Sequence, residues 1–126
     1  MSAAAGFLPG QHPIDAYGAG GFRFAEMSHR GSLLALPSGV YAWAARAVAD
    51  IDAASLAPVF AETPGLIDHL LIGTGRDLAP LSPALQARLQ AAGIRGEPMA
   101  TGAAARTYNI LLGERRRVAA ALLAVG

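Results

Sequence analysis

The sequence predicts a single α/β domain (α+β in the looser sense) with a mixed β-sheet, in which an N-terminal hairpin is followed by strand–helix–strand–helix–strand. Three observations lead to this fold class. A length of 126 residues fits one domain and can bury a single core. A composition with 53% hydrophobic and 15% charged residues excludes disorder for most of the chain. After residue 66, apolar strands alternate with segments of helical period, which is typical of right-handed crossovers.

The first residues are predicted to lie outside the globular unit. Residues 1–16 contain several glycines and prolines without any periodicity, and this composition is typical of a flexible N-terminal arm. The globular domain is therefore expected to span residues 17–126. Its first strand is expected at residues 22–24, where the alternation Phe-Arg-Phe puts both phenylalanines on one face.

The hairpin is expected next along the chain. Residues 33–36 and 40–43 are short apolar or alternating runs, which favour strands. Pro37-Ser38-Gly39 between them predicts a tight turn, because proline fixes the first bend and glycine accepts a positive φ. Further on, Ser55 is a candidate N-cap for a short helix to residue 60, before Pro64-Gly65.

The second half predicts three strands and two helices. Residues 66–72 give the clearest buried strand, and residues 94–99 and 118–125 the other two. Ser82-Pro83 has the sequence of a helix start, and Gly93 that of a helix end. The second helix should begin at Thr101 and end near Arg115. The inward-facing residues of the first helix recur at helical spacing and are Leu85, Leu89 and Ala92.

Composition also limits the classes of function. The chain has no cysteine, so disulfides, thiol nucleophiles and cysteine metal sites are excluded. The net charge of +1 is too small to indicate nucleic-acid binding, and no apolar run reaches the ~18–20 residues of a membrane span. We expect a cytoplasmic protein that does not span a membrane. No residue pattern points to a metal or a cofactor.

One polar stripe on the helix after Thr101 is a candidate binding site. At 100° per residue, Gly102, Arg106, Asn109 and Gly113 lie within roughly 60° of one another. A guanidinium, an amide and a helix start could together bind a carboxylate or a phosphate. Alternatively, Arg106 and Asn109 hold loop carbonyls, and Gly102 only permits close packing. The sequence leaves both interpretations open.

A second candidate follows the strand that ends at residue 72. Gly73-Thr74-Gly75 begins like a dinucleotide-binding turn, but the third glycine and the helix start are missing, so a nucleotide site is not favoured. If the strands before Gly73 and Thr101 are parallel neighbours, both loops lie at one carboxyl edge, where α/β sheets generally bind ligands. The candidate ligand-binding residues are Gly73, Thr74, Gly75, Arg76, Thr101, Gly102, Arg106 and Asn109.

Several short motifs resemble those of a known family. They lie at residues 17–24, 31–34, 36–40, 71–75 and 101–111. In these segments the chain resembles the small domain-of-unknown-function family that includes the mitochondrial respiratory complex I (NADH:ubiquinone oxidoreductase) assembly factor 3. The resemblance covers about residues 17–125. It implies a compact three-layer β+β/α domain without an established enzymatic activity. The mitochondrial branch acts as an assembly chaperone on complex I intermediates.

Two positions depart from the pattern of bacterial relatives, which often carry an acidic residue at Ala100 and a cysteine at Ala105. The resemblance therefore favours a non-enzymatic interaction or assembly-factor-like protein over an enzyme. Its expected partners are respiratory-chain or membrane-protein assembly components, met in the cytoplasm or peripherally at the inner membrane face. The alternative is a small-molecule or anion-binding protein, or an enzyme, that uses the cleft between residues 73–76 and 101–106.

Overall fold

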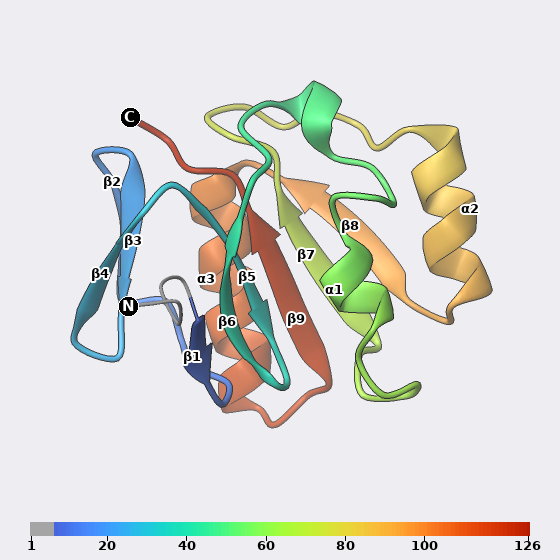
Figure 1. Ribbon diagram of the computed structural model, residues 1–126, viewed down its shortest axis with the longest axis horizontal. Coiled ribbons are helices and arrows are strands. Elements are labelled where there is room, and N and C mark those ends of the chain that lie inside the picture. Colours follow the sequence, from blue (N-terminus) through green and yellow to red (C-terminus); the bar gives the residue numbers. More distant parts are fainter. Residues whose placement is uncertain (1–6) are drawn as a thin grey trace.

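The computed structural model describes residues 7–126 and contains two β-sheets (Figure 1). The larger sheet is mixed and six-stranded; in spatial order its strands are β1 (Phe7–Pro9), β6 (Gly39–Trp43), β5 (Ser32–Leu36), β9 (Val118–Leu122), β7 (His69–Gly73) and β8 (Arg95–Met99). The smaller sheet is antiparallel and consists of β2 (Ala16–Gly18), β3 (Gly21–Phe24) and β4 (Met27–Arg30). The helical segments are a 3₁₀ turn at Val48–Asp50, α1 (Ala57–Phe60), α2 (Pro83–Ala91) and α3 (Thr101–Gly113).

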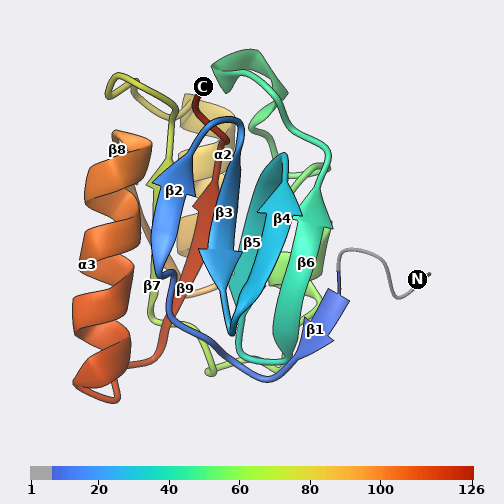
Figure 2. The ribbon, with the colours of Figure 1, turned by 90° about the vertical axis from the view of Figure 1, so that its left-hand side faces the viewer.

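These elements form three layers around the large sheet. Helices α1 and α2 cover one face, while α3 and the small sheet lie side by side on the other (Figures 1 and 2). Parallel β7 lies between β8 and β9, and β5 joins this parallel part to the antiparallel hairpin with β6. The mixed sheet, the hairpin and the three-layer arrangement are therefore confirmed.

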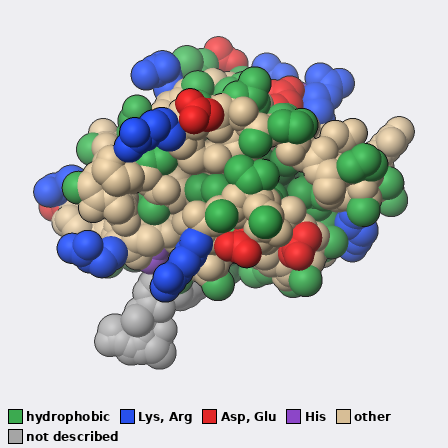
Figure 3. Space-filling model, turned by 90° about the horizontal axis from the view of Figure 1, so that it is seen from above, with side chains coloured by type: hydrophobic (Ala, Val, Ile, Leu, Met, Phe, Trp, Pro, Cys, Tyr) green, Lys and Arg blue, Asp and Glu red, His purple; other side chains and the backbone are tan. Residues whose placement is uncertain are grey.

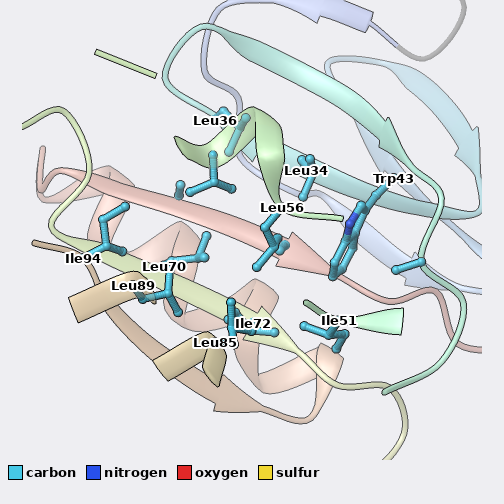
Figure 4. Close-up of a cluster of buried hydrophobic side chains, with 14 of the residues drawn as sticks. Leu34, Leu36, Trp43, Ile51, Leu56, Leu70, Ile72, Leu85, Leu89 and Ile94 are labelled. Carbon is cyan, nitrogen blue, oxygen red and sulfur yellow. The ribbon is translucent and has the colours of Figure 1, made fainter. Parts of the chain in front are cut away.

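The large sheet has one hydrophobic cluster on each face because successive strand residues point to opposite sides. Leu34, Leu36, Leu70 and Ile72 face α1 and α2, where they meet Trp43, Leu56, Leu85 and Leu89 (Figure 4). The other cluster lies under α3 and the small sheet; among its members are Ile14, Phe22, Phe24, Leu33, Leu71, Ala104, Ala105 and Tyr108. The chain thus buries both faces of its central sheet.

Most predicted elements are present, with shifted ends. Ser82 caps α2, since its Oγ accepts a hydrogen bond from the Leu85 N–H at 3.2 Å. Leu85 and Leu89 are buried as expected, but Ala92 is exposed because it is the C-cap residue, beyond the last turn of α2. The strand expected from residue 66 begins only at His69, and Leu66 is 44% exposed in the turn before it.

Ser55 does not cap α1. Leu56 occupies the N-cap position, without a side-chain hydrogen bond. Ser55 Oγ instead exchanges hydrogen bonds with the backbone of Asp52, accepting from its N–H and donating to its carbonyl. The short helix was predicted correctly, but Ser55, the predicted N-cap, stabilises the turn before the helix.

Residues 7–16, expected to belong to a loose arm, contact the domain along their length; residues 1–6 lie outside the described residues. β1 pairs with β6 in antiparallel register, and Ile14 is only 4% exposed. Strands β2 and β4 were also not predicted, because most of their side chains are exposed and show no apolar alternation. The longest helix in residues 7–126 is α3, with 13 residues, and none there is long and apolar enough to cross a bilayer.

Candidate functional site

The two candidate loops meet at the carboxyl ends of β7 and β8. These strands are parallel neighbours, with Gly73 opposite Met99. The Thr74 N–H donates to the Met99 carbonyl, and the Thr101 N–H donates to the Gly75 carbonyl, both at 2.8 Å. Figure 3 views the molecule from this side: hydrophobic side chains gather near the middle, with arginine and acidic side chains interspersed around them. The sequence therefore predicted correctly that both loops share one edge.

Two threonines at this edge have structural hydrogen bonds. Thr101 Oγ1 donates to the Leu123 carbonyl at 2.8 Å and accepts from the Gly75 N–H at 3.0 Å. Thr74 Oγ1 lies 2.7 Å from the Asp77 carbonyl and accepts from the Ala79 N–H at 3.0 Å. Both residues are buried. Their hydroxyl groups hold loop backbone together and do not point into an open space.

Gly73 has a packing role at the same place. A Cβ added there would lie 2.9 Å from Thr101 Oγ1 and 3.0 Å from Leu122 Cδ2. Real Cβ atoms essentially never come this close to backbone or buried side chains, so glycine is required for the start of α3 to pack against the end of β7. Gly73 thus belongs to the framework of the edge.

Asn109 holds the segment before β2 against α3. Its Oδ1 accepts from the Ile14 N–H at 2.8 Å, and its Nδ2 donates to the Ile14 carbonyl at 2.7 Å. The neighbouring Tyr108 hydroxyl donates to the His12 carbonyl at 2.8 Å. Tyr108 is fully buried, and burial raises the pKa of its phenol well above the usual range. For Asn109, the structural interpretation left open by the sequence is supported.

Gly102 is covered by a residue that sequence reasoning did not select. The phenol of Tyr17, at the middle of β2, lies against it, and a Cβ at position 102 would collide with the Tyr17 hydroxyl. Tyr17 nevertheless remains 48% exposed. No signal in the sequence links the two positions, since Tyr17 lies in a glycine-rich stretch far from α3 along the chain.

The remaining candidates surround one hollow of about 310 Å³. Gly75 and Arg76 line it from the β7–α2 loop, Gly102 and Arg106 from α3, and Tyr17 from β2. Within residues 7–126 neither guanidinium makes a hydrogen bond or an ion pair, and both side chains are exposed. The structure thus brings four of the eight predicted residues to a common surface, while Gly73, Thr74, Thr101 and Asn109 do not line the hollow.

These features define the class of the protein as a three-layer α+β domain. At its polar edge some side chains hold the backbone together, and others form an open basic surface. Residues 14–123 match the family described as "Protein of unknown function (DUF498/DUF598)". The chain belongs to this family. The family expected from the sequence motifs is thereby confirmed.

Relatives of known sequence are of two kinds. An uncharacterised protein of Rhodobacter capsulatus is 46% identical over 90% of this chain and 86% of its own length. The NADH dehydrogenase [ubiquinone] 1 alpha subcomplex assembly factor 3 of Xenopus tropicalis is 30% identical over 87% of this chain. That match spans only 60% of the assembly factor.

Solved structures agree with the fold. A Bartonella henselae protein described as an outer membrane protein is 47% identical, with a TM-score of 0.89 over 94% of this chain and 98% of that one. The Rpa2829 protein of Rhodopseudomonas palustris is 46% identical, with a TM-score of 0.81 over 99% and 93%. A Bordetella pertussis protein described as an Mth938-like domain is 34% identical, with a TM-score of 0.78 over 89% and 85%. The chain therefore has the Mth938-like fold.

Proposed function

We propose that this chain is a non-enzymatic interaction protein of the assembly-factor kind, which assists respiratory complex I or membrane-protein biogenesis. The observation that carries the proposal is the 30% identity to a complex I assembly factor over 87% of the chain. Its partners would be respiratory-chain or membrane-protein assembly components. We propose that it meets them in the cytoplasm, peripherally at the inner membrane face.

The hydrogen bonds of the candidate site support an interaction role over a catalytic one. Thr74, Thr101 and Asn109 use their side-chain groups on the backbone of the fold. The polar side chains that line the hollow at this edge are two guanidinium ions and a phenol, whose residue types are enriched at protein interfaces. Such groups recognise a surface more readily than they transfer a proton at neutral pH.

The test is affinity purification of the tagged full chain from its native cells, with complex I measured in membranes of a deletion strain. We expect respiratory-chain or membrane-protein assembly components to co-purify, and fully assembled complex I to fall in the deletion strain. A purification free of such components, together with a normal amount of complex I after deletion, would contradict the proposal.

A second candidate function is the binding of a small molecule or an anion in the hollow between the two loops. The chain would then be a binding protein or an enzyme. Arg76 and Arg106 line this hollow, and their guanidinium groups have no partner among residues 7–126, which favours this candidate. Thermal unfolding with added phosphate, pyrophosphate, dicarboxylates and nucleotides tests it, because a ligand that binds only the native state raises Tm. A rise that disappears in Arg106→Gln supports a site here; no rise with any of these compounds rejects it.

A further inference from the structure

We infer that the exposed surface around Tyr17 docks an acidic segment of a protein partner. This surface, called the Tyr17 surface below, consists of Tyr17, Arg76 and Arg106. The inference deepens the proposed function and rests on it, since it names the chemistry of the partner that an interaction protein of this shape would bind.

Tyr17 lies between two hollows that open on opposite faces of the small sheet. One, of about 310 Å³, is the hollow beside α3 that Arg76 and Arg106 border. The other, of about 610 Å³, lies over the small sheet and is bordered by Arg23 and Arg30. Figure 2 shows β2 between α3 and β3, with the small sheet facing the viewer. Tyr17 pairs with Phe22, so its ring lies on the face towards α3, against Gly102, and borders the hollow beside α3.

The arginines of the small sheet belong to a separate surface. Gly21 pairs with Arg30, and Arg23 pairs with both Ser28 and Ala16, so Arg23 and Arg30 share one face of the sheet. The side chain of Tyr17 lies on the opposite face, because Tyr17 pairs with Phe22. The two arginines that share a hollow with the Tyr17 ring are therefore Arg76 and Arg106.

The two arginines of the Tyr17 surface have no counter-ion within residues 7–126. In this part of the chain neither guanidinium group makes a hydrogen bond or an ion pair, and no aspartate or glutamate lines the hollow beside α3. Elsewhere the chain does provide partners: Arg116 lies 3.8 Å from Glu114, Arg117 donates to the Gly65 carbonyl, and Arg88 stacks on Phe60. The Tyr17 surface is thus an uncompensated basic patch around an exposed aromatic ring.

An acidic protein segment fits this patch best. Carboxylates bind arginine through paired hydrogen bonds, and opposite charge speeds and orients docking. Tyrosine and arginine are the residue types that most often dominate binding energy at protein interfaces. A nucleic acid would meet the same arginines through phosphates, but a net charge of +1 gives the chain little general attraction for a polyanion.

The inference is tested by amide NMR titration of the full chain with a short peptide of aspartate and glutamate containing one phenylalanine. The control peptide has asparagine and glutamine in place of the acids. We expect shifts of the amides of β2, Gly75, Arg76 and the first turn of α3, with binding about tenfold weaker for the control peptide, equivalent to about 1.4 kcal/mol. Arg76→Glu with Arg106→Glu should weaken binding of the acidic peptide by a similar factor.

A matched variant separates the surface from overall charge. Arg95→Glu with Arg115→Glu makes the same charge change at exposed arginines outside both hollows. We expect it to bind the acidic peptide almost like the wild type. Equal weakening in both double variants would overturn the inference. So would shifts confined to other elements, or binding here of inorganic pyrophosphate or oligothymidylate but not of the peptide.

This result can be separated from the test of the proposed function. If assembly components co-purify equally with the wild type and with Arg76→Glu/Arg106→Glu, the Tyr17 surface is wrong while the interaction role stands. If the acidic peptide binds as expected but no assembly component co-purifies, the surface stands and the assembly role is wrong.

Discussion

Among single residues, Asn109 links two parts of the chain that lie far apart in sequence. Its amide makes both hydrogen bonds to the backbone of Ile14, which is itself buried against the core under α3. Asn109→Ala should lower the free energy of unfolding by about 1–3 kcal/mol, because it leaves two backbone groups without their partners. Urea denaturation measures this. Arg106→Gln changes an exposed side chain, so its free energy of unfolding should stay within about 0.5 kcal/mol of the wild-type value. Equal losses of stability in Asn109→Ala and Arg106→Gln would contradict the role assigned to Asn109.

The contact between Gly102 and Tyr17 gives a second prediction at this scale. Alanine is favoured over glycine inside a helix by about 1 kcal/mol, but the Tyr17 phenol occupies the space that a Cβ would need. Gly102→Ala should therefore not stabilise the wild-type chain, yet should stabilise the Tyr17→Ala variant by about 0.5–1 kcal/mol. A thermal-unfolding double-mutant cycle measures the coupling. Gly113→Ala, where a Cβ meets nothing within 4 Å, is the control.

Tyr108 predicts how stability changes in alkali. Burial raises the pKa of its phenol above the ordinary value of 10.0, so the native state holds this proton more tightly than the unfolded state. The resulting stabilisation is complete below about pH 10 and is lost as the pH rises towards the folded pKa. The free energy of unfolding should fall above about pH 10, and less steeply in Tyr108→Phe. An identical slope in both proteins would contradict this.

At the scale of elements, α2 was predictable because its signals are local. Ser82, Pro83 and Gly93 mark its ends, and Gly93 has the positive φ of +74° that glycine accepts readily. Ser82→Ala should lower stability by about 1 kcal/mol, since the Leu85 N–H loses its acceptor. Chemical denaturation measures this loss. Ser55→Ala should leave the N-terminus of α1 unchanged, because Ser55 does not cap it. Faster hydrogen exchange of the α1 amides in that variant would contradict this assignment.

The elements that were not predicted lack such local signals. β2 and β4 are short, and most of their side chains are exposed, so no alternation distinguishes them from loop. β1 contains Pro9 and is paired only with β6, which is typical of an edge strand. The small sheet exists because Phe22 and Phe24 of β3 bury one face beside α3, and this depends on contacts distant in sequence.

For the molecule as a whole, the sequence predicted the edge at which the candidate loops meet better than the directions of their side chains. Parallel pairing of β7 and β8 brings both candidate loops together, as their order along the chain indicated. The sequence could not show that Thr74, Thr101 and Asn109 face inward, nor that Tyr17 covers Gly102. Both facts depend on contacts between segments that are distant in sequence, whereas helical periodicity describes each element alone.

The central claim is that the exposed Tyr17 surface, not the buried polar cluster, carries the function of the chain. The most direct measurement is the amount of assembled complex I in the membranes of a deletion strain complemented with variants expressed at equal folded levels. We predict that Arg76→Glu/Arg106→Glu fails to restore complex I, whereas Arg95→Glu/Arg115→Glu restores it as the wild type does. Full restoration by Arg76→Glu/Arg106→Glu would contradict the claim.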